Sequence, residues 1–575
     1  MSRPKPPVPL DQALQTALEH HRAGRLPAAE TIYRQILSAQ PDHVDALNLF
    51  GVLAHQVGRL DVARELIDKA LSLSPRFAEA HNNLASVLLA QGDLAGAETH
   101  YRRTIALAPD HVGARVNLGN LLWQSGRFAD AAKACREAIR RAPDMAEAHN
   151  NLGNALKDMG DAASALASYR QAVALNPDYA AAHSNLGNLL CDLGQPAAAI
   201  AYYQRALALE PGVADYHMNL GNALRDLARL PEAVAAYARA LALKPELGET
   251  HWNLAITLLV GGDFARGWAA YQKRWQTRRL AAHRRSFAVP QWDGGDPAGR
   301  TILVHAEQGM GDMIQFCRYL PLLRARGART VLLIDGPWRQ LAPLLHSLDG
   351  VDRLALDLAD AGAFDLHCPL LDLPLRFGTE LATIPARVPY LAADPARADW
   401  RARLADDGRP RIGIVWAGNR SNTRDRLRTL GLAPLLPLLA LPGLRWFGLQ
   451  VGDGRHDLEG QELPPGFTDL GPELRDFADT AAVLAELDLT ISVDTSVAHL
   501  SGALGRPTWV LLPTAPDWRW LLERPDSPWY PTARLFRQPA AGDWASVIAR
   551  VGDALTALAA GNRGVLVPAS ARTGI

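Results

Sequence analysis

The chain has 575 residues, more than one hydrophobic core supports, so we expect two to four domains. Lysine plus arginine and aspartate plus glutamate both number 60, and this zero formal net charge argues against a general nucleic-acid or anionic-membrane binder. The hydrophobic fraction of 48% and the charged fraction of 21% are typical of a soluble globular protein.

The cysteines and the N-terminal residues indicate in which cellular compartment the protein is expected. None of the cysteines forms a CxxC pair, so neither a zinc site nor a disulfide framework is indicated. Residues 1–9 lack an apolar run behind their basic residues, and no stretch of about 18 apolar residues occurs, so we expect no signal peptide and no membrane span. These features predict a cytoplasmic protein. The cysteines are Cys135, Cys191, Cys317 and Cys368.

Four series of residues recur every 34 positions through the first half. Prolines stand at Pro41, Pro75, Pro109, Pro143, Pro177, Pro211 and Pro245. Glycines stand at Gly24, Gly58, Gly92, Gly126, Gly160, Gly194 and Gly262, with Ala228 in the one gap. Small residues stand at Gly51, Ala85, Gly119, Gly153, Gly187, Gly221 and Ala255, and alanines at Ala29, Ala63, Ala97, Ala131, Ala165, Ala199 and Ala233.

These series predict units of two helices. The glycine ends the first helix, the proline limits the second, and the small residues let the two helices approach closely. One such unit cannot bury its apolar face alone, so the units stack. Residues 9–280 resemble the tetratricopeptide repeat family, with seven to eight units and a degenerate last one, which implies an α-solenoid.

Two further series concern aromatic and histidine side chains. Cys135 shares its repeat position with the tyrosines, so we expect it to fill the core rather than to react. The histidines recur on successive units on the order of 10 Å apart, too far for shared metal ligation, and Arg115 takes one place in that series. The tyrosines are Tyr33, Tyr101, Tyr169, Tyr203, Tyr237 and Tyr271. The histidines are His81, His149, His183, His217 and His251.

Asparagines also recur on the first helix of each unit, although asparagine is a mediocre helix former. One interpretation is a ladder of amides that binds an extended peptide, similar to the asparagine ladder of tetratricopeptide-repeat O-GlcNAc transferases. The other is hydrogen bonding between units. The first series is Asn83, Asn117, Asn151, Asn185, Asn219 and Asn253. A second series three residues later is Asn120, Asn154, Asn188 and Asn222.

The repeat spacing fails after Tyr271, and residues 273–300 carry a basic run, either a solvated helix face or a phosphate-facing surface. We take 281–300 as a linker. From Thr301 the pattern changes to short apolar runs separated by helical stretches, which predicts an α/β fold with parallel sheets. We expect an N-terminal lobe over 301–395, a C-terminal lobe over 396–560 and a tail over 561–575.

Eight segments are candidate strands, and the one at 350–354 is weaker than the others. They are 301–304, 330–334, 350–354, 364–369, 411–416, 444–450, 487–493 and 508–512, and 508–512 is expected to be the last strand of the chain. A helix is expected from Met313 to Leu323. Together the chain reads as an α-solenoid followed by two Rossmann-like lobes.

Between the first strand and that helix lies a turn with two glycines and one acid, Gly309, Gly311 and Asp312, preceded by Gln308. Ligands of open α/β sheets bind where strands hand over to helices, so a carboxylate here is well placed to act on a ligand.

Three elements of the second lobe carry candidate chemistry. Asp494, Thr495 and Ser496 can cap a helix whose start favours phosphate, and His499 either reaches that ligand or is a structural histidine. A polar loop, 417–428, contains Gly418, Arg424, Arg426 and Arg428, which suit a diphosphate or form a surface charge run. Segments 516–520, with Arg519, and 527–530 either line a cleft or pack the domain.

Gln308–Asp312, Asp494–His499 and Gly505–Leu511 resemble motifs of the ADP-heptose:lipopolysaccharide heptosyltransferase superfamily over roughly residues 300–540. The resemblance implies a GT-B fold with Asp312 as catalytic base and Gln308, Gly309 and Gly311 on the acceptor side. It also implies donor binding by Asp494, Thr495 and His499, and we add Ser496 and Gly418 from the same two loops as candidate donor-binding residues. The family's lysine is absent, so Arg426 or Arg428 would replace it.

The predicted function is inverting sugar transfer from a nucleotide-diphosphate donor to an acceptor hydroxyl on a polypeptide that the repeats recruit. The peptide ladder that would bind this polypeptide is Asn117, Asn151, Asn185, Asn219 and Asn253. No Asp-x-Asp occurs in the second half, so we expect no metal and no other cofactor, and no nucleic-acid partner. The alternatives are a non-catalytic repeat scaffold with a degenerate transferase domain, and a glycan or lipid-linked sugar as acceptor.

Overall fold

The computed structural model describes residues 9–346, 348–397, 399–404, 407–418 and 428–570. The chain divides into two compact units, residues 1–212 and 213–575. Helical repeats occupy the first unit and the start of the second, and an α/β region with two parallel sheets follows, which confirms the predicted fold class.

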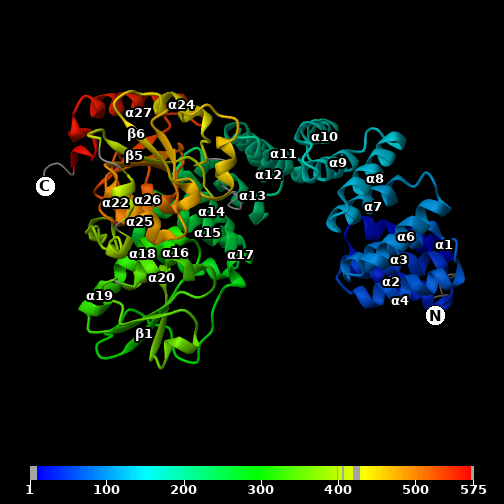
Figure 1. Ribbon diagram of the computed structural model, residues 1–575. Coiled ribbons are helices and arrows are strands. Elements are labelled where there is room, and N and C mark those ends of the chain that lie inside the picture. The colour runs from blue at the N-terminus through cyan, green and yellow to red at the C-terminus, as the bar shows by residue number, and fades with distance from the viewer. Residues whose placement is uncertain (1–8, 347, 398, 405–406, 419–427, 571–575) are drawn as a thin grey trace. The chain divides into compact units, whose positions relative to one another are not determined.

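The first unit consists of antiparallel helix pairs, visible as the blue and cyan ribbons of Figure 1. The glycine that ends each first helix has a φ between 71° and 85°, the left-handed conformation that the repeat predicted. The helices are α1 (Leu10–Arg22), α2 (Leu26–Ala39), α3 (Val44–Gln56), α4 (Leu60–Leu73), α5 (Ala78–Ala90), α6 (Leu94–Leu107), α7 (Val112–Gln124), α8 (Phe128–Arg141), α9 (Ala146–Asp158), α10 (Ala162–Leu175), α11 (Ala180–Asp192) and α12 (Pro196–Leu209).

The small residue of each first helix makes room for the aromatic side chain of the second. A Cβ added at Gly153 would lie 2.6 Å from Cδ1 of Tyr169, which is itself 1% exposed. Cys135 occupies the same place with no exposed surface, so it fills the core as expected. Burial raises the pKa of the Cys135 thiol to about 12, so this thiol stays protonated and unreactive at neutral pH.

The second unit begins with the last repeat helices. Trp268 is 2% exposed and packs edge-on against Phe316 and Trp518, which belong to the α/β region. The last repeat therefore shares a hydrophobic core with that region. The helices are α13 (Ala214–Asp226), α14 (Leu230–Leu243), α15 (Gly248–Val260), α16 (Phe264–Tyr271), the 3-10 helix η1 (Gln272–Gln276) and α17 (Arg278–Ala281).

Two parallel sheets follow. The first has the order β3-β2-β1-β4 and the second β10-β9-β8-β5-β6-β7. Their strands are β1 (Thr301–His305), β2 (Arg329–Leu333), β3 (Arg353–Ala355), β4 (Leu366–Pro369), β5 (Arg411–Val415), β6 (Arg445–Gly448), β7 (Phe467–Asp469), β8 (Leu489–Val493), β9 (Thr508–Leu512) and β10 (Ala533–Arg537).

Strands β7 and β10 correct the expectation from sequence. Residues 508–512 are not the last strand, because β10 pairs with β9 at the edge of the second sheet. β7 is three residues long and half exposed, too short for a periodic signal, and β10 interleaves arginines with its apolar residues. Both are edge strands, where the apolar pattern is weakest.

Most of the described helices of the α/β region have ten residues or fewer. The expected helix from Met313 to Leu323 is broken into α18 and α19 by a 3-10 turn, Cys317–Tyr319. The helices are α18 (Met310–Phe316), α19 (Leu320–Ala325), α20 (Ala342–Leu345), α21 (Leu373–Arg376), α22 (Asp399–Arg403), α24 (Leu436–Leu439), α25 (Phe477–Glu486), α26 (Ser496–Ala503) and α27 (Trp544–Ala559). None of the described helices is long and apolar enough to cross a membrane.

Candidate functional site at the meeting of the two sheets

The strand order of each sheet indicates where a ligand binds. In the second sheet the chain proceeds outward from β5 through β6 to β7 and, on the other side, from β8 through β9 to β10. The loops after β5 and β8 therefore diverge, and such a switch point opens the crevice that binds ligands in this fold. The first sheet has an equivalent switch point between β1 and β4.

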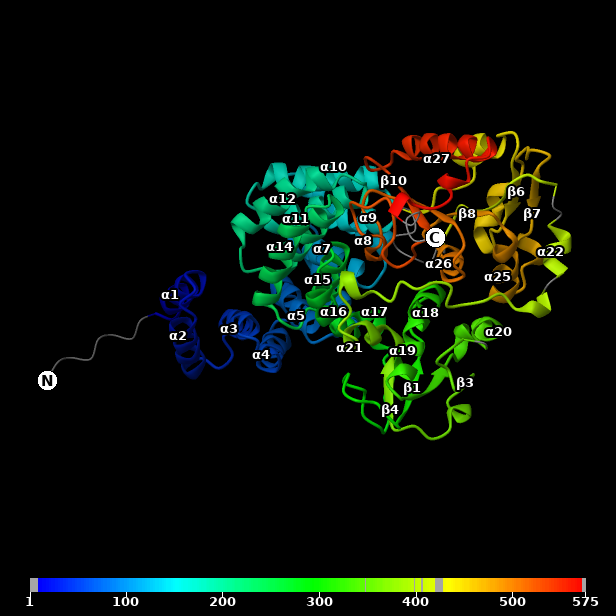
Figure 2. The ribbon, with the colours of Figure 1, turned by 90° about the vertical axis from the view of Figure 1, so that its left-hand side faces the viewer.

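Helices that follow these switch points pack against each other. Figures 1 and 2 show α18 and α26 between the sheet of β1 and the sheet of β8. A Cβ added at Gly311 would lie only 2.9 Å from Cδ2 of His499 and 3.5 Å from Cα of Ser496. Glycine at 311 is therefore what allows the starts of the two helices to meet.

Asp312 lies in the first turn of α18, with its side chain 17% exposed. Its Oδ2 accepts a 2.7 Å hydrogen bond from the backbone N–H of Gly309, and its Oδ1 accepts one from Arg519 of the second lobe. Burial raises the pKa of Asp312, and the positive charge of Arg519 opposes that rise. Asp312 is thus a carboxylate of increased basicity held at the junction of the lobes.

Arg519 lies on the 3-10 helix η11 (Trp518–Trp520) and is 9% exposed. Besides Asp312, it donates to Gln315 of α18 and, at 2.7 Å, to Asp517. Its guanidinium also lies 4.3 Å from the ring centre of Trp518. Segment 516–520 therefore packs against the first lobe and supplies the cation that pairs with Asp312, while its place in a cleft stays a prediction.

His499 is 5% exposed, and two aromatic side chains hold its ring in place. Its Nδ1 lies 3.0 Å from the hydroxyl of Tyr530, and its ring stacks on Trp520 at 5.3 Å. Burial, followed by the charge of Arg519, lowers the pKa of His499 well below its usual range, so the imidazole is neutral. Its Nε2 is 3.9 Å from Oδ1 of Asp494, beyond hydrogen-bond reach.

The start of α26 differs in one respect from the expectation. Thr495 is the N-cap residue, but its side chain makes no capping hydrogen bond; its hydroxyl lies 2.9 Å from that of Ser492 instead. Ser496 begins the helix. Among the described residues no side chain caps this end, and phosphate binding at the N–H groups of this helix start stays a prediction.

The loops at the second switch point contact each other. Arg428 donates a 2.9 Å hydrogen bond from Nη1 to the carbonyl oxygen of Asp494, and Gly418 donates to the hydroxyl of Thr429 at 3.0 Å. Burial and the nearby Asp517 raise the pKa of Asp494 to about 6. Arg424 and Arg426 lie outside the described residues.

The last repeat also reaches the site. Gln308, whose φ of 60° is left-handed, donates a 2.8 Å hydrogen bond to the hydroxyl of Tyr271. In earlier repeats this tyrosine hydroxyl donates to an asparagine of its own unit, whereas the last unit has Ile256 there. The sequence analysis missed this contact, although the break in the asparagine series at Ile256 is its signal.

A buried ion-pair network joins the last repeat to the first lobe. Arg274 has no exposed surface and donates from Nε and Nη2 to Glu307 at 2.9 and 2.7 Å, and from Nη1 to Asp372 at 2.7 Å. Glu307 also accepts from the N–H of Leu371 at 3.1 Å. Glu307 directly precedes Gln308, so this network fixes the loop after β1. The sequence placed Arg274 only within a basic run.

The asparagine series makes contacts between and within repeats. Asn117 donates to Asn82 at 3.4 Å, and Asn185 donates to Asn150 at 2.9 Å. Asn150 donates to Asn151 at 3.4 Å, and Asn253 accepts from Arg225 at 3.1 Å. Asn219 is half-buried. The inter-unit interpretation thus has direct support, while peptide binding by the remaining amide groups stays a prediction.

In the described part of the chain, no group of three or more histidine, cysteine, aspartate or glutamate side chains is arranged to hold a metal ion.

Comparison with known proteins identifies the helical half. Models described as "Tetratricopeptide repeat" match residues 14–76, 56–112, 82–146, 116–156, 185–248 and 218–279, and a "TPR repeat" model matches 153–194. The repeats are tetratricopeptide repeats. These models end before the α/β region, so they say nothing of its activity.

One relative is Protein FlbA of Caulobacter vibrioides, 30% identical over 329 residues, which are 53% of this chain and 54% of that protein. The chain thus spans about half the length of the curated relative that it matches. Among solved structures, one from the APC/C hetero-tetramer Cut9-Hcn1 has 20% identity and a TM-score of 0.41, covering 44% of this chain and 50% of that one. A tetratricopeptide repeat protein of Parabacteroides merdae has 16% identity and a TM-score of 0.37, covering 43% and 98%.

Proposed function

We propose that the α/β region transfers a sugar from a nucleotide-diphosphate donor to an acceptor hydroxyl, with Asp312 as general base. One observation carries the proposal: a carboxylate of raised pKa from one lobe pairs with Arg519 of the other lobe, beside the start of α26 and at the switch points of both sheets. Two facing Rossmann-like lobes with this distribution of charge suit a donor diphosphate on one side and an acceptor on the other.

In the proposed step, the acceptor oxygen attacks the anomeric carbon while the bond from that carbon to the diphosphate oxygen breaks. Asp312 takes the proton of the acceptor hydroxyl, and the nucleoside diphosphate leaves with the electron pair of the broken bond. Arg428 and the N–H groups at the start of α26 stabilise the leaving diphosphate. A single displacement inverts the configuration of the sugar.

The acceptor in this proposal is a hydroxyl of a polypeptide. Tetratricopeptide repeats commonly bind peptides, and the last repeat contacts the loop before Asp312 through Tyr271 and Gln308. A peptide held by the repeats could therefore be presented next to the base. A glycan or lipid-linked acceptor is the other outcome of the experiment below.

The test is to incubate the full chain with a panel of nucleotide sugars and candidate acceptors, and to measure nucleoside diphosphate release and the mass of the acceptor. Asp312→Asn should lower turnover by about 10²–10⁴-fold, because general-base help contributes that much. Nucleotide-sugar binding, followed by thermal shift, should survive. Activity should persist in EDTA, and an absolute need for Mn²⁺ or Mg²⁺ would contradict the mechanism.

Asp517→Asn is the matched control, because Asp517 pairs with the same Arg519 but is not the proposed base. It should lower turnover by much less than Asp312→Asn. For the wild type, turnover should fall as the pH drops through the raised pKa of Asp312, since the protonated acid cannot accept a proton. Equal turnover of Asp312→Asn and wild type would remove Asp312 from the mechanism.

One observation favours a second candidate, a non-catalytic nucleotide sensor. Both carboxylate oxygens of Asp312 already accept hydrogen bonds, from Gly309 and Arg519. A sensor would bind nucleotide sugars in the thermal-shift assay without releasing diphosphate or modifying any acceptor, which separates it from the transferase.

A further inference from the structure

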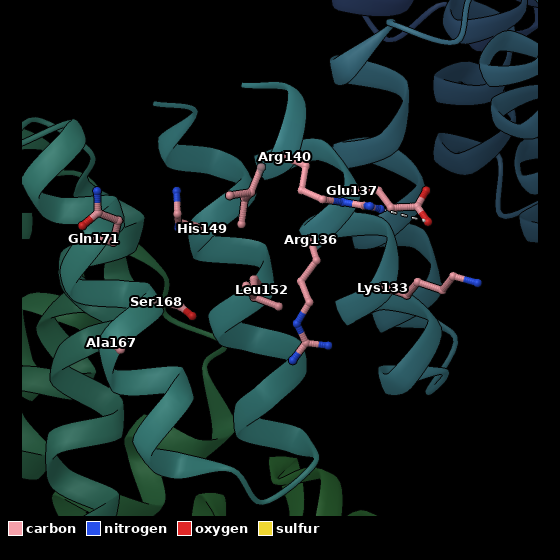
Figure 3. A pocket seen from close by; sticks show the side chains of 10 residues that line it. Lys133, Arg136, Glu137, Arg140, His149, Leu152, Ala167, Ser168 and Gln171 are labelled. Carbon is pink, nitrogen blue, oxygen red and sulfur yellow. Dashed lines mark ion pairs between the residues drawn. The ribbon is translucent and has the colours of Figure 1, made fainter. Parts of the chain in front are cut away.

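A groove lies on the surface of the first unit, along α8, α9 and α10. It has a volume of about 710 Å³, and Figure 3 shows its lining side chains coming from all three helices. The exposed cations Lys133, Arg136 and Arg140 of α8 form one side, and Leu152 of α9 lies between them and the residues of α10.

This groove is distinct from the asparagine series. His149 and Leu152 of α9 line the groove. Each residue turns the helix by about 100°, so side chains three residues apart lie within about 60° of each other around the helix axis. By the same rotation, Asn151 and Asn154 point to the opposite side of α9. A partner in the groove would therefore not compete with a peptide on the asparagine face.

The repeat acts as an internal reference for this surface. Where the other units have alanine or serine, the unit 112–145 has Arg140, and at the next position, mostly leucine elsewhere, it has Arg141. Lys133 stands where the others have threonine, alanine or glutamate, and Arg115 stands in the histidine series. Each of these departures introduces a positive charge at a position that the repeat does not need charged.

The charge balance of the units changes accordingly. Residues 112–145 contain six lysines and arginines against three aspartates and glutamates. The flanking units, 78–111 and 146–179, each contain two basic and four acidic residues. A positive patch thus lies between two acidic units in a chain of zero net charge.

The cations of the groove are incompletely neutralised. Arg140 reaches Glu137 only at 3.6 Å, with 70% of its side chain exposed. Within the described residues, no carboxylate lies within ion-pair distance of Lys133 or Arg136. Arg115 of α7 does not line the groove, but it is 5% exposed and its Nε finds no hydrogen-bond partner in the described part of the chain. The site therefore carries excess positive charge over a partly apolar floor.

We propose that this groove, which we call the α8–α10 groove, binds an acidic amphipathic segment of a partner protein. Carboxylates of the segment pair with Arg136, Arg140 and Lys133, and its apolar side chains cover Leu152 and Ile139. Desolvated charge pairs beside an apolar floor give an interface both affinity and register. The proposal does not depend on sugar transfer.

The test uses a fluorescent synthetic helix of about four turns with leucines on one face and glutamates on the other, titrated with the full chain by fluorescence anisotropy. Binding should weaken at higher salt. The double variant Arg136→Glu with Arg140→Glu should raise the Kd about tenfold or more, because two attractive pairs become repulsive.

The matched control is Arg103→Glu with Arg170→Glu, which makes the same change in net charge at two exposed arginines outside the groove. It should leave the Kd nearly unchanged. Equal weakening by both double variants, equal binding of a peptide with glutamine in place of glutamate, or no binding at about 1 mM chain would each overturn the proposal. So would tighter, groove-dependent binding of a single-stranded RNA, which would make the surface a nucleic-acid site.

Discussion

The repeats and the α/β region use polar side chains in different ways. In the repeats, a polar residue that recurs serves the packing of its unit: Tyr169 donates to Asn154, and the same pair returns one unit later as Tyr203 and Asn188. In the α/β region, the polar side chains of the candidate site do not recur at a fixed spacing. Asp312 and Arg519 form one such pair, where the two lobes meet. Recurrence thus points to the fold, and a single occurrence points to a site.

The same contrast holds inside the repeats. Tyr271 is a recurring residue, but Ile256 stands where the preceding units have the asparagine that pairs with this tyrosine. The Tyr271 hydroxyl accepts a hydrogen bond from Gln308 of the candidate site instead. Arg140 departs from the repeat and lines a groove. A departure from the period is therefore the more informative signal for function, and substitutions of single-copy residues should have larger effects than substitutions of recurring ones.

The largest effect should come from Arg274→Leu. Arg274 is fully buried and pairs with both Glu307 and Asp372. Leucine would take away the cation that Glu307 pairs with and would leave Asp372 only the 3.9 Å contact to Arg376 and the hydrogen bond from Gln291. Breaking a buried ion pair from one side typically costs about 3–5 kcal/mol. We expect a loss of that size in the free energy of unfolding, measured by denaturant titration with tryptophan fluorescence.

The control for Arg274 is Arg266→Leu, which breaks the exposed ion pair with Asp263 on the same repeat. Exposed pairs contribute little, so its unfolding midpoint should stay close to that of the wild type. If the two variants lost the same stability, the network around Arg274 would not be what joins the last repeat to the first lobe.

A smaller loss is expected for Gly311→Ala. The added Cβ would lie 2.9 Å from the ring of His499, which Tyr530 and Trp520 hold in place. Overpacking of this kind typically costs about 1–3 kcal/mol. The melting temperature should fall, and nucleotide-sugar binding should weaken with it. Gly466→Ala is the control, because the nearest atom lies 3.6 Å from the added Cβ, and this variant should have the melting temperature of the wild type. A wild-type melting temperature for Gly311→Ala would show instead that α18 and α26 can move apart at no cost.

How far the sequence predicts these features depends on how local they are. The 34-residue period gave the repeat helices and their left-handed glycines, because each depends on neighbours within one unit. Beyond the repeats, continuous apolar runs predicted β1, β5, β8 and β9. Asp312 was a prediction from its turn, but its partner Arg519 lies 207 residues away, and no local pattern encodes that pairing. Arg274 likewise looked like one member of a basic run, since burial is a property of the folded chain.

The smallest effect should come from a recurring pair. Tyr169→Phe removes the 2.7 Å hydrogen bond to Asn154, a loss of about 0.5–1.5 kcal/mol near neutral pH. The value should lie near the lower end, because Oδ1 of Asn154 still accepts from Asn185 at 3.3 Å. Tyr202→Phe is the control, since that tyrosine is half-buried and makes no hydrogen bond among the described residues.

The same variant should change how stability depends on pH. Burial raises the pKa of Tyr169 above its ordinary value of about 10. At pH values between the pKa of this tyrosine in the unfolded chain and its higher pKa in the folded protein, the folded state keeps a proton that the unfolded state has released. The stabilisation is complete below pH 10 and is lost as the pH rises, by about 1.4 kcal/mol per pH unit. Phenylalanine does not titrate. The wild type should therefore be the more stable protein near pH 8, and Tyr169→Phe should equal or exceed it near about pH 11. Parallel pH dependences of the two proteins in circular dichroism melts would mean that the Tyr169 hydroxyl ionises in the folded repeat as readily as in the unfolded chain.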